Sequence, residues 1–236
     1  MNPTLLAHAD LDFNAPMSDA RAEELIAALA PLNSAEVVDL GCGWAELLLR
    51  LLEAEPSATG IGIDTTGEEL SRGRHNAEIR GVAERARFVQ SDAGSWDGTA
   101  DVVISVGSSH AWGGTRQALE AIRPRLRHGG RLLFGEAFRE TTPMPDDLGV
   151  DLSLADLVEL TEECGFRMLR LATASTDEWD SFESRWCGAL EKWLLNNPTA
   201  AGREEVRALA DEHRTGWLRG YRGALGFAYL VLTPGS

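Results

Sequence analysis

A glycine turn directly follows an apolar run that ends at residue 40. Its sequence is GCGWAE, residues 41–46, and Asp39 stands two positions before the first glycine. Gly41 and Gly43 let the backbone pass close to a ligand, and the free amides at the start of the next helix attract an anionic group. The carboxylate of Asp39 would meet a cationic group nearby. The turn therefore predicts a site for a small ligand that carries both charges.

Acidic residues also close the next two strand-like runs. Asp64 ends the run 59–64, while Asp92 and Ala93 come shortly after the run 86–90. The carboxyl ends of parallel strands meet at one edge of an α/β sheet, which is where such sheets bind ligands. A carboxylate at position 64 can accept both hydroxyls of a ribose, and a carboxylate with a backbone amide at positions 92 and 93 can contact adenine. A nucleoside site is expected at this edge.

The glycine turn does not suit a dinucleotide. Nicotinamide and flavin enzymes share the GxG pattern, but their third glycine, which makes room for a pyrophosphate, would fall at Glu46. S-adenosylmethionine has no pyrophosphate, and its methionine end carries an ammonium and a carboxylate that match Asp39 and the loop amides. S-adenosylmethionine is therefore the expected cofactor. A NAD-dependent oxidoreductase is the less favoured alternative.

Motifs spread over residues 36–136 resemble those of class I S-adenosylmethionine-dependent methyltransferases. They read VVDLGCGWAE, GIDTT, RFVQSDAG, DVVISVGSSHAWGG and LRHGGRLLFGE. Residues 8–16, 136–138 and 179–183 extend the resemblance to stand-alone bacterial small-molecule methyltransferases. The resemblance implies methyl transfer to nitrogen, oxygen or sulfur of a small-molecule acceptor. A protein that only binds S-adenosylmethionine, or uses it for a non-methylating reaction, is the alternative.

The same resemblance assigns the cofactor to residues of the glycine turn and of the strand ends. These are Asp39, Gly41, Cys42, Gly43, Asp64, Thr65, Asp92, Ala93 and Val106. The turn with its preceding acid would hold the methionine moiety, the acid of the second strand the ribose, and the pair after the third strand the adenine. The usual third small position of the turn is Ala45, which still permits close approach.

Two residues are candidates for catalysis. Methyl transfer is an in-line displacement in which alignment supplies much of the rate, and a base is needed only if the acceptor must lose a proton. His110, in VGSSHAWGG, is the candidate base because imidazole titrates near neutral pH. Glu136 could orient an amine or a hydroxyl. The alternative for His110 is a structural role as a loop histidine bonded to backbone. The alternative for Glu136 is a salt bridge to Arg139.

Seven strand-like runs alternate with helical patterns along the chain. The runs are 36–40, 59–64, 86–90, 101–106, 131–135, 166–173 and 225–232, and the helical patterns are 44–54, 67–80, 115–127 and 153–164. This order predicts an α/β domain, residues 1–236, with a doubly wound, mostly parallel seven-stranded sheet, which the resemblance identifies as a Rossmann-like methyltransferase fold. Residues 1–30 should be an extended segment to residue 17 and then a helix. The last strand, followed by Pro234, is expected at an edge.

A helical insertion, residues 177–223, precedes the last strand. Trp179, Phe182, Trp186, Leu190 and Trp193 fall at helical spacing, so one face must contact something apolar. The insertion is expected to cap the substrate site. Candidate walls of a substrate pocket, which offer π faces to a cation, are Trp112, Trp179 and Trp186. The alternative is that these rings only dock the helix on the domain.

Composition limits the partners. The 236 residues carry a formal net charge of −15, which repels nucleic acid and anionic membranes. No run approaches the roughly 18 apolar residues of a membrane span, and no histidine spacing indicates a metal. The three cysteines form no CxxC pair, which suits a reducing cytoplasm. The oligomeric state cannot be predicted from these features.

Overall fold

The computed structural model describes residues 2–141 and 148–235, and its core is one seven-stranded sheet. The strand order is β3-β2-β1-β4-β5-β7-β6. The strands are β1 (Glu36–Leu40), β2 (Thr59–Asp64), β3 (Ala86–Gln90), β4 (Ala100–Val106), β5 (Leu126–Arg139), β6 (Phe166–Thr173) and β7 (Leu225–Pro234). The order reverses at β1 and β4, so their carboxyl ends frame the crevice where doubly wound sheets bind ligands.

The last strand lies inside the sheet, and the expected edge position is wrong. β7 runs antiparallel between β5 and β6, from the pair Arg139 with Leu225 to the pair Phe166 with Pro234. The chain enters β7 from the edge at which its neighbours end, so it must run back in the opposite direction. Residues 226–232 are all buried, as in a strand covered on both sides. The proline occupies the last pair, where the ladder ends.

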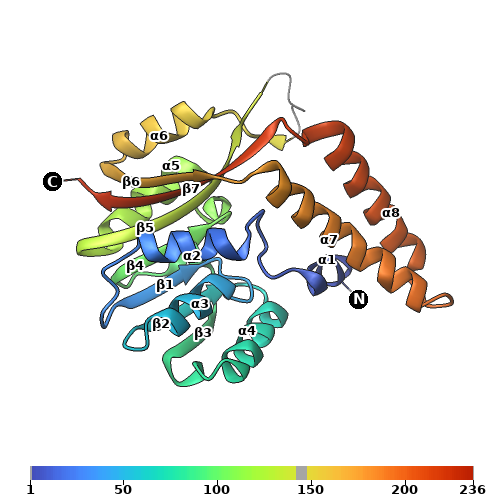
Figure 1. Ribbon diagram of the computed structural model, residues 1–236, viewed down its shortest axis with the longest axis horizontal. Helices are drawn as coiled ribbons and strands as arrows, with labels where there is room; N and C mark the ends of the chain where they lie inside the picture. The colour runs from blue at the N-terminus through green and yellow to red at the C-terminus, as the bar shows by residue number, and fades with distance from the viewer. Residues whose placement is uncertain (1, 142–147, 236) are drawn as a thin grey trace.

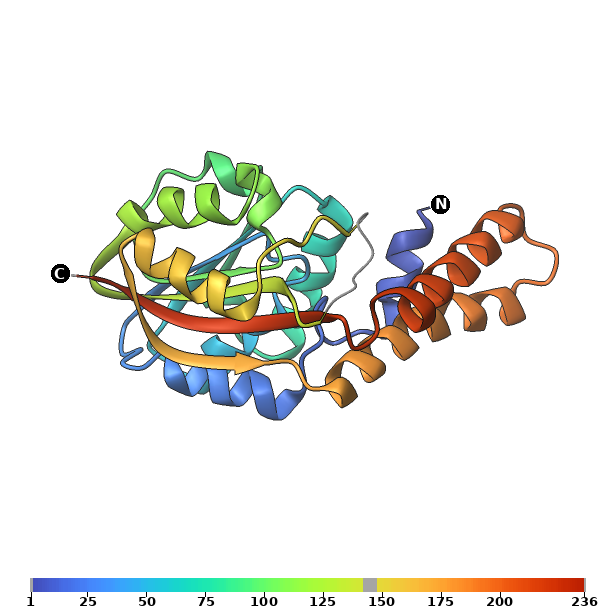
Figure 2. The same ribbon diagram turned by 90° about the horizontal axis from the view of Figure 1, so that it is seen from above.

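Helices cover both faces of the sheet, as Figure 2 shows for α5 and α6 on one side and α2 on the other. The first face carries α2 (Asp19–Ala28), α3 (Glu46–Ala54) and α4 (Gly67–Ile79). The second carries α5 (Thr115–Ile122) and α6 (Leu154–Glu163). Each face has its own apolar cluster, because each helix buries one stripe of leucine, isoleucine or alanine against the strands.

The boundary between α5 and β5 differs from the expected one. The helix ends at Ile122 rather than 127, because Pro124 follows and the residues around it form a 3₁₀ turn. β5 is longer than the predicted 131–135: it starts to pair with β4 at Leu126 and stays paired with β7 as far as Arg139.

The chain before residue 18 is not simply extended, which corrects the sequence prediction. Pro3–Ala7 form α1, in which Pro3 takes the first position and the side chain of Asn2 accepts a hydrogen bond from the amide of Thr4 at 3.0 Å. A third apolar cluster joins α1 to a helical hairpin, α7 (Thr176–Asn196) and α8 (Arg203–Thr215). The hairpin projects beyond the end of β6, with α1 beside it (Figure 1).

Candidate active site

The glycine turn between β1 and α3 passes through the left-handed region of backbone conformation. Gly41, Gly43 and Ala45 all have positive φ, at 75°, 54° and 58°. A side chain at Gly41 would place its Cβ 2.5 Å from that of Ser108, so only glycine fits there. The amides of Gly41 and Cys42 donate to the carbonyl of Ile63 at 2.8 and 3.0 Å, which fastens the turn to β2.

Asp39 places a buried carboxylate below this turn. The residue is 5% exposed, and among the described residues no hydrogen bond reaches its carboxylate. Burial, and then the charge of Asp64, raise its pKa to about 8. A carboxylate in this state gains most from a cationic partner. The site therefore fits an ammonium group.

The acids that end β2 and β3 are oriented by backbone amides. Gly43 and Thr66 each donate an amide to Asp64 at 2.8 Å, one to each carboxylate oxygen. The carboxylate of Asp92 accepts the amide of Gly94 at 2.7 Å, and Ala93 beside it is buried. Each carboxylate oxygen keeps a further lone pair, so both acids can still accept hydrogen bonds from ligand hydroxyl or amino groups.

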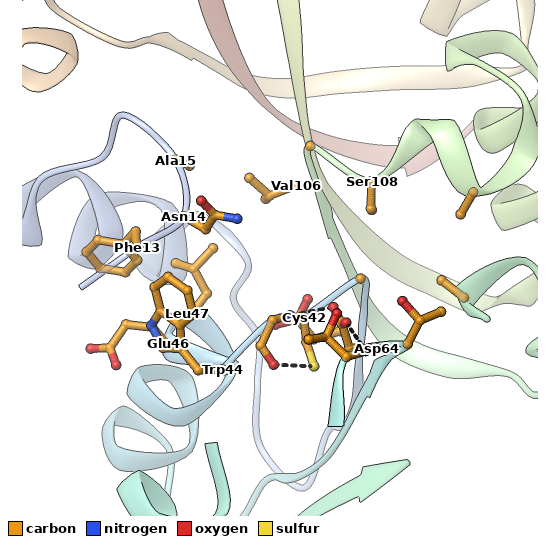
Figure 3. A pocket seen from close by; sticks show the side chains of 18 of the residues that line it. Phe13, Asn14, Ala15, Cys42, Trp44, Glu46, Leu47, Asp64, Val106 and Ser108 are labelled. Atoms are coloured by element: carbon orange, nitrogen blue, oxygen red, sulfur yellow. Dashed lines mark hydrogen bonds between the residues drawn. The ribbon is translucent and has the colours of Figure 1, made fainter. Parts of the chain in front are cut away.

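One cavity of about 480 Å³ collects these groups, a volume within the range for small-molecule sites. Figure 3 shows side chains of this cavity, with Cys42 and Asp64 opposite Asn14 and Val106. All nine expected cofactor residues line it: Asp39, Gly41, Cys42, Gly43, Asp64, Thr65, Asp92, Ala93 and Val106. They come from the ends of β1, β2, β3 and β4. The four strand ends meet at one edge of the sheet, which brings these residues together.

The N-terminal segment supplies a wall that sequence reasoning missed. Phe13, Asn14, Ala15 and Met17 line the cavity. They lie in a stretch with no periodic pattern, so the only sequence signal was the resemblance of residues 8–16 to other methyltransferases. Contacts across the fold, and not local propensity, hold this wall in place.

Two side chains fasten the segment that precedes this wall. The indole of Trp44 donates to the carbonyl of Asp12 at 2.6 Å. Arg72 on α4 lies over the Trp44 ring at 4.0 Å and donates to the carbonyl of His8 at 2.8 Å and to that of Leu11 at 2.5 Å. We call these contacts of Trp44 and Arg72 the clasp.

Glu46, where a dinucleotide turn would have its third glycine, has a structural role. It is buried and accepts hydrogen bonds from Arg50 at 2.7 Å and from Arg80 at 2.7 and 2.8 Å. Its charge is therefore paired within the protein, although it also lines the cavity.

The two candidate catalytic residues lie close to each other, after β4 and along β5. His110 lines the cavity, in a 3₁₀ turn, Ser109–Trp112. Glu136 stands outside the described lining, and its carboxylate accepts the hydroxyl of Thr115 at 3.4 Å. Burial raises the pKa of Glu136, while hydrogen bonds, including one from Ser109, and the nearby charge of His110 oppose the rise. No salt bridge joins it to Arg139 among the ion pairs of the described chain.

The three candidate tryptophans lie away from this cavity. Trp112 packs against the apolar cluster under α5 and α6. Trp186 is buried in the hairpin, where it stacks on His213 with ring centroids 3.7 Å apart. Trp179 contacts Phe227, whose ring lies 3.9 Å from the position of a Cβ on Gly107 in the cavity wall.

Within residues 2–141 and 148–235, no helix has both the length and the apolar composition to cross a membrane. Nor do three or more histidine, cysteine, aspartate or glutamate side chains gather there in a way that could hold a metal ion.

Comparison with known proteins gives one consistent result. A sequence profile described as a methyltransferase domain matches residues 38–132. The uncharacterized protein YjhP of Escherichia coli strain K12 is 28% identical over 204 residues, which cover 82% of each chain. An S-adenosylmethionine-dependent methyltransferase from Geobacter sulfurreducens, in complex with S-adenosylhomocysteine, has a TM-score of 0.90 at 26% identity, covering 98% of this chain and 97% of that one. A second one, from Thiobacillus denitrificans with the same ligand, has a TM-score of 0.88 at 26% identity, covering 97% and 96%.

Proposed function

We propose that this chain, whose fold and motifs are those of the class I S-adenosylmethionine-dependent methyltransferases, methylates nitrogen, oxygen or sulfur of a small-molecule acceptor. The chain is accordingly an enzyme with S-adenosylmethionine as its cofactor. One observation carries the proposal: nine residues from four strand ends line one cavity around the carboxylate of Asp39, to which no described residue donates a hydrogen bond.

In this proposal, the chain holds the cofactor through three contacts. Asp39 pairs with the ammonium of the methionine moiety, Asp64 accepts the ribose hydroxyls, and Asp92 with Ala93 contacts the adenine. The geometry supports each assignment, because the carboxylate of Asp39 accepts no hydrogen bond from residues 2–141 and 148–235, and the other two carboxylates are already oriented by amides. When bound, the cofactor supplies a methyl group activated by a positively charged sulfur.

We propose that His110 accepts a proton from the acceptor molecule and that Glu136 orients the acceptor molecule. His110 lies at the end of the cavity wall formed after β4, and Glu136 lies close enough for its charge to interact with that of His110. A carboxyl group whose pKa is raised by burial is suited to hydrogen-bond an amine or a hydroxyl.

The hairpin of α7 and α8 is proposed to cap the acceptor side. Trp179 supports this, because its contact with Phe227 leads to the cavity wall at Gly107. Trp112 and Trp186 would act indirectly, through packing. The acidic charge argues for a small acceptor rather than nucleic acid, and the free thiols Cys42, Cys164 and Cys187 fit a reducing cytoplasm.

The first test is titration calorimetry of the folded protein with S-adenosylhomocysteine and with NADH. We expect binding of the first and none of the second. A screen of amine, phenol and thiol metabolites with S-adenosylmethionine, read out as formation of S-adenosylhomocysteine, then identifies the acceptor class. No uptake of S-adenosylhomocysteine would overturn the proposal. Binding without turnover of any acceptor class would favour a binding protein or a non-methylating enzyme.

A further inference from the structure

The lining of the cofactor cavity is acidic. Its acidic side chains are those of Asp39, Glu46, Asp64 and Asp92, and the described residues add no arginine or lysine to the lining. The amino-acid end of the proposed cofactor carries a carboxylate beside its ammonium. That carboxylate must therefore be met by neutral hydrogen-bond donors.

Most neutral side-chain donors at the turn are already used. The indole of Trp44 donates to the carbonyl of Asp12. The hydroxyl of Ser108 donates to the carbonyl of Leu40 at 2.7 Å, and the thiol of Cys42 to the carbonyl of Gly43 at 3.4 Å. The amides of Gly41 and Cys42 donate to the carbonyl of Ile63 and that of Gly43 to Asp64, so these loop amides are used as well.

Asn14 faces the turn from the opposite wall. Its two neighbours, Phe13 and Ala15, are buried, whereas Asn14 is exposed and its side chain extends into the cavity between Val106 and Trp44 (Figure 3). Within the described chain, no hydrogen bond occupies its amide. It is the one side-chain amide in the described lining.

The backbone around Asn14 is held on both sides. Trp44 bonds the carbonyl of Asp12, and the buried hydroxyl of Tyr229 donates to the carbonyl of Pro16 at 3.0 Å. The backbone of a segment anchored in this way has little freedom left to lose when a ligand binds.

We infer that the side-chain amide of Asn14 donates a hydrogen bond to the carboxylate at the amino-acid end of the cofactor, opposite the contact of Asp39 with the ammonium. The inference rests on the proposed function. An amide suits this position because it donates without adding a charge that the surrounding carboxylates would pair with. A hydrogen bond to a charged group is also stronger than one between neutral groups.

The experiment compares two ligands on three proteins. S-adenosylhomocysteine carries the amino-acid end, whereas 5′-methylthioadenosine has the same nucleoside and thioether without it. Calorimetry is performed on the wild type, Asn14→Ala and Asn14→Asp. We expect Asn14→Ala to weaken the binding of S-adenosylhomocysteine about tenfold or more. Asn14→Asp should weaken this binding further, because an aspartate side chain has the same shape as asparagine but only accepts hydrogen bonds. Binding of 5′-methylthioadenosine should change less than about threefold in both, which also shows that the variants are folded.

The control is Asn196→Ala, an exposed asparagine at the end of α7, which should bind both ligands as the wild type does. If Asn14→Ala weakens the binding of both ligands equally, the inference is overturned, because the loss of affinity would then come from a disturbed N-terminal wall of the cavity. Unchanged affinity for S-adenosylhomocysteine would overturn it too, while leaving the proposed function intact. Failure of the wild type to bind S-adenosylhomocysteine would instead remove the proposed function.

Discussion

Asp39 and Asp64 extend from neighbouring parallel strands into one cavity, and the charge of the second adds to the burial that raises the pKa of the first. Asp39 pairs in register with Gly62, two residues before Asp64. The resulting pKa of about 8 leaves Asp39 largely protonated at neutral pH until a cation arrives. The ligand-free site is therefore less negative than its sequence suggests.

Ligand binding should release a proton. An ammonium next to Asp39 lowers its pKa, so S-adenosylhomocysteine should displace about one proton near pH 7, and affinity should rise as the pH increases toward 8. Calorimetry in phosphate and in Tris measures the release, because the two buffers differ in ionisation heat. Equal heats in the two buffers would contradict the prediction, and Asp39→Asn should show no release.

The same group should make stability depend on pH. Because the folded-state pKa of Asp39 lies above its ordinary 3.8, the folded protein keeps a proton that the unfolded chain gives up. The contribution of Asp39 to the free energy of unfolding is thus full below that ordinary value and is lost as the pH rises through about 8. Asp39→Asn should raise the Tm relative to wild type more at about pH 9 than at about pH 5, while it weakens ligand binding. A Tm difference that does not change with pH would be inconsistent with this account.

Breaking the clasp should loosen the N-terminal wall. Arg72→Ala removes the donors to the carbonyls of His8 and Leu11 and the contact with Trp44, so we expect about 1 to 3 kcal/mol lower stability and weaker S-adenosylhomocysteine binding. Hydrogen exchange should increase in residues 3–17 specifically. The matched control is Arg74→Ala, an exposed arginine of the same helix. Unchanged exchange in residues 3–17 would exclude a clasp.

Replacing the proposed base should slow turnover without affecting cofactor binding. With the acceptor identified, His110→Ala should lower kcat by about 10² to 10⁴, the usual contribution of general base catalysis, and leave the affinity for S-adenosylhomocysteine within a few-fold. His128→Ala, at an exposed histidine, serves as the control. By contrast, a kcat within threefold of wild type would mean that His110 only shapes the pocket. A tenfold change in kcat corresponds to about 1.4 kcal/mol of activation free energy.

A buried glutamate should stabilise the hairpin. Glu183 is 2% exposed and lies 2.6 Å from Nε2 of His213, and it accepts the hydroxyl of Tyr221 at 2.7 Å. Glu183→Ala leaves both partners without a bond, so we expect a loss of about 2 to 4 kcal/mol in urea unfolding. Glu191→Ala, on the exposed side of α7, should cost less than about 1 kcal/mol. Similar losses for the two variants would argue against a specific role of the buried cluster.

Local signals predicted much of the sheet. The runs 36–40, 59–64, 86–90 and 166–173 match β1, β2, β3 and β6 residue for residue, and Gly41, Asp64, Arg85 and Gly165 mark one end of each run. The glycine turn and the acids after these strands could be assigned to one edge, because the carboxyl ends of parallel strands meet at the same edge of the sheet, independently of the loops that follow them.

What the sequence alone determined was thus the parallel sheet, its ligand-binding edge and the groups on β1, β2 and β3 that line the cavity. Only the tertiary structure decided that β7 enters between β5 and β6, that Asn14 forms the opposite wall, and that Trp186 packs on His213 instead of facing the cavity. The physical reason is that periodicity and turn residues act over a few neighbours, whereas these placements depend on packing between segments far apart in the chain, which no local pattern encodes.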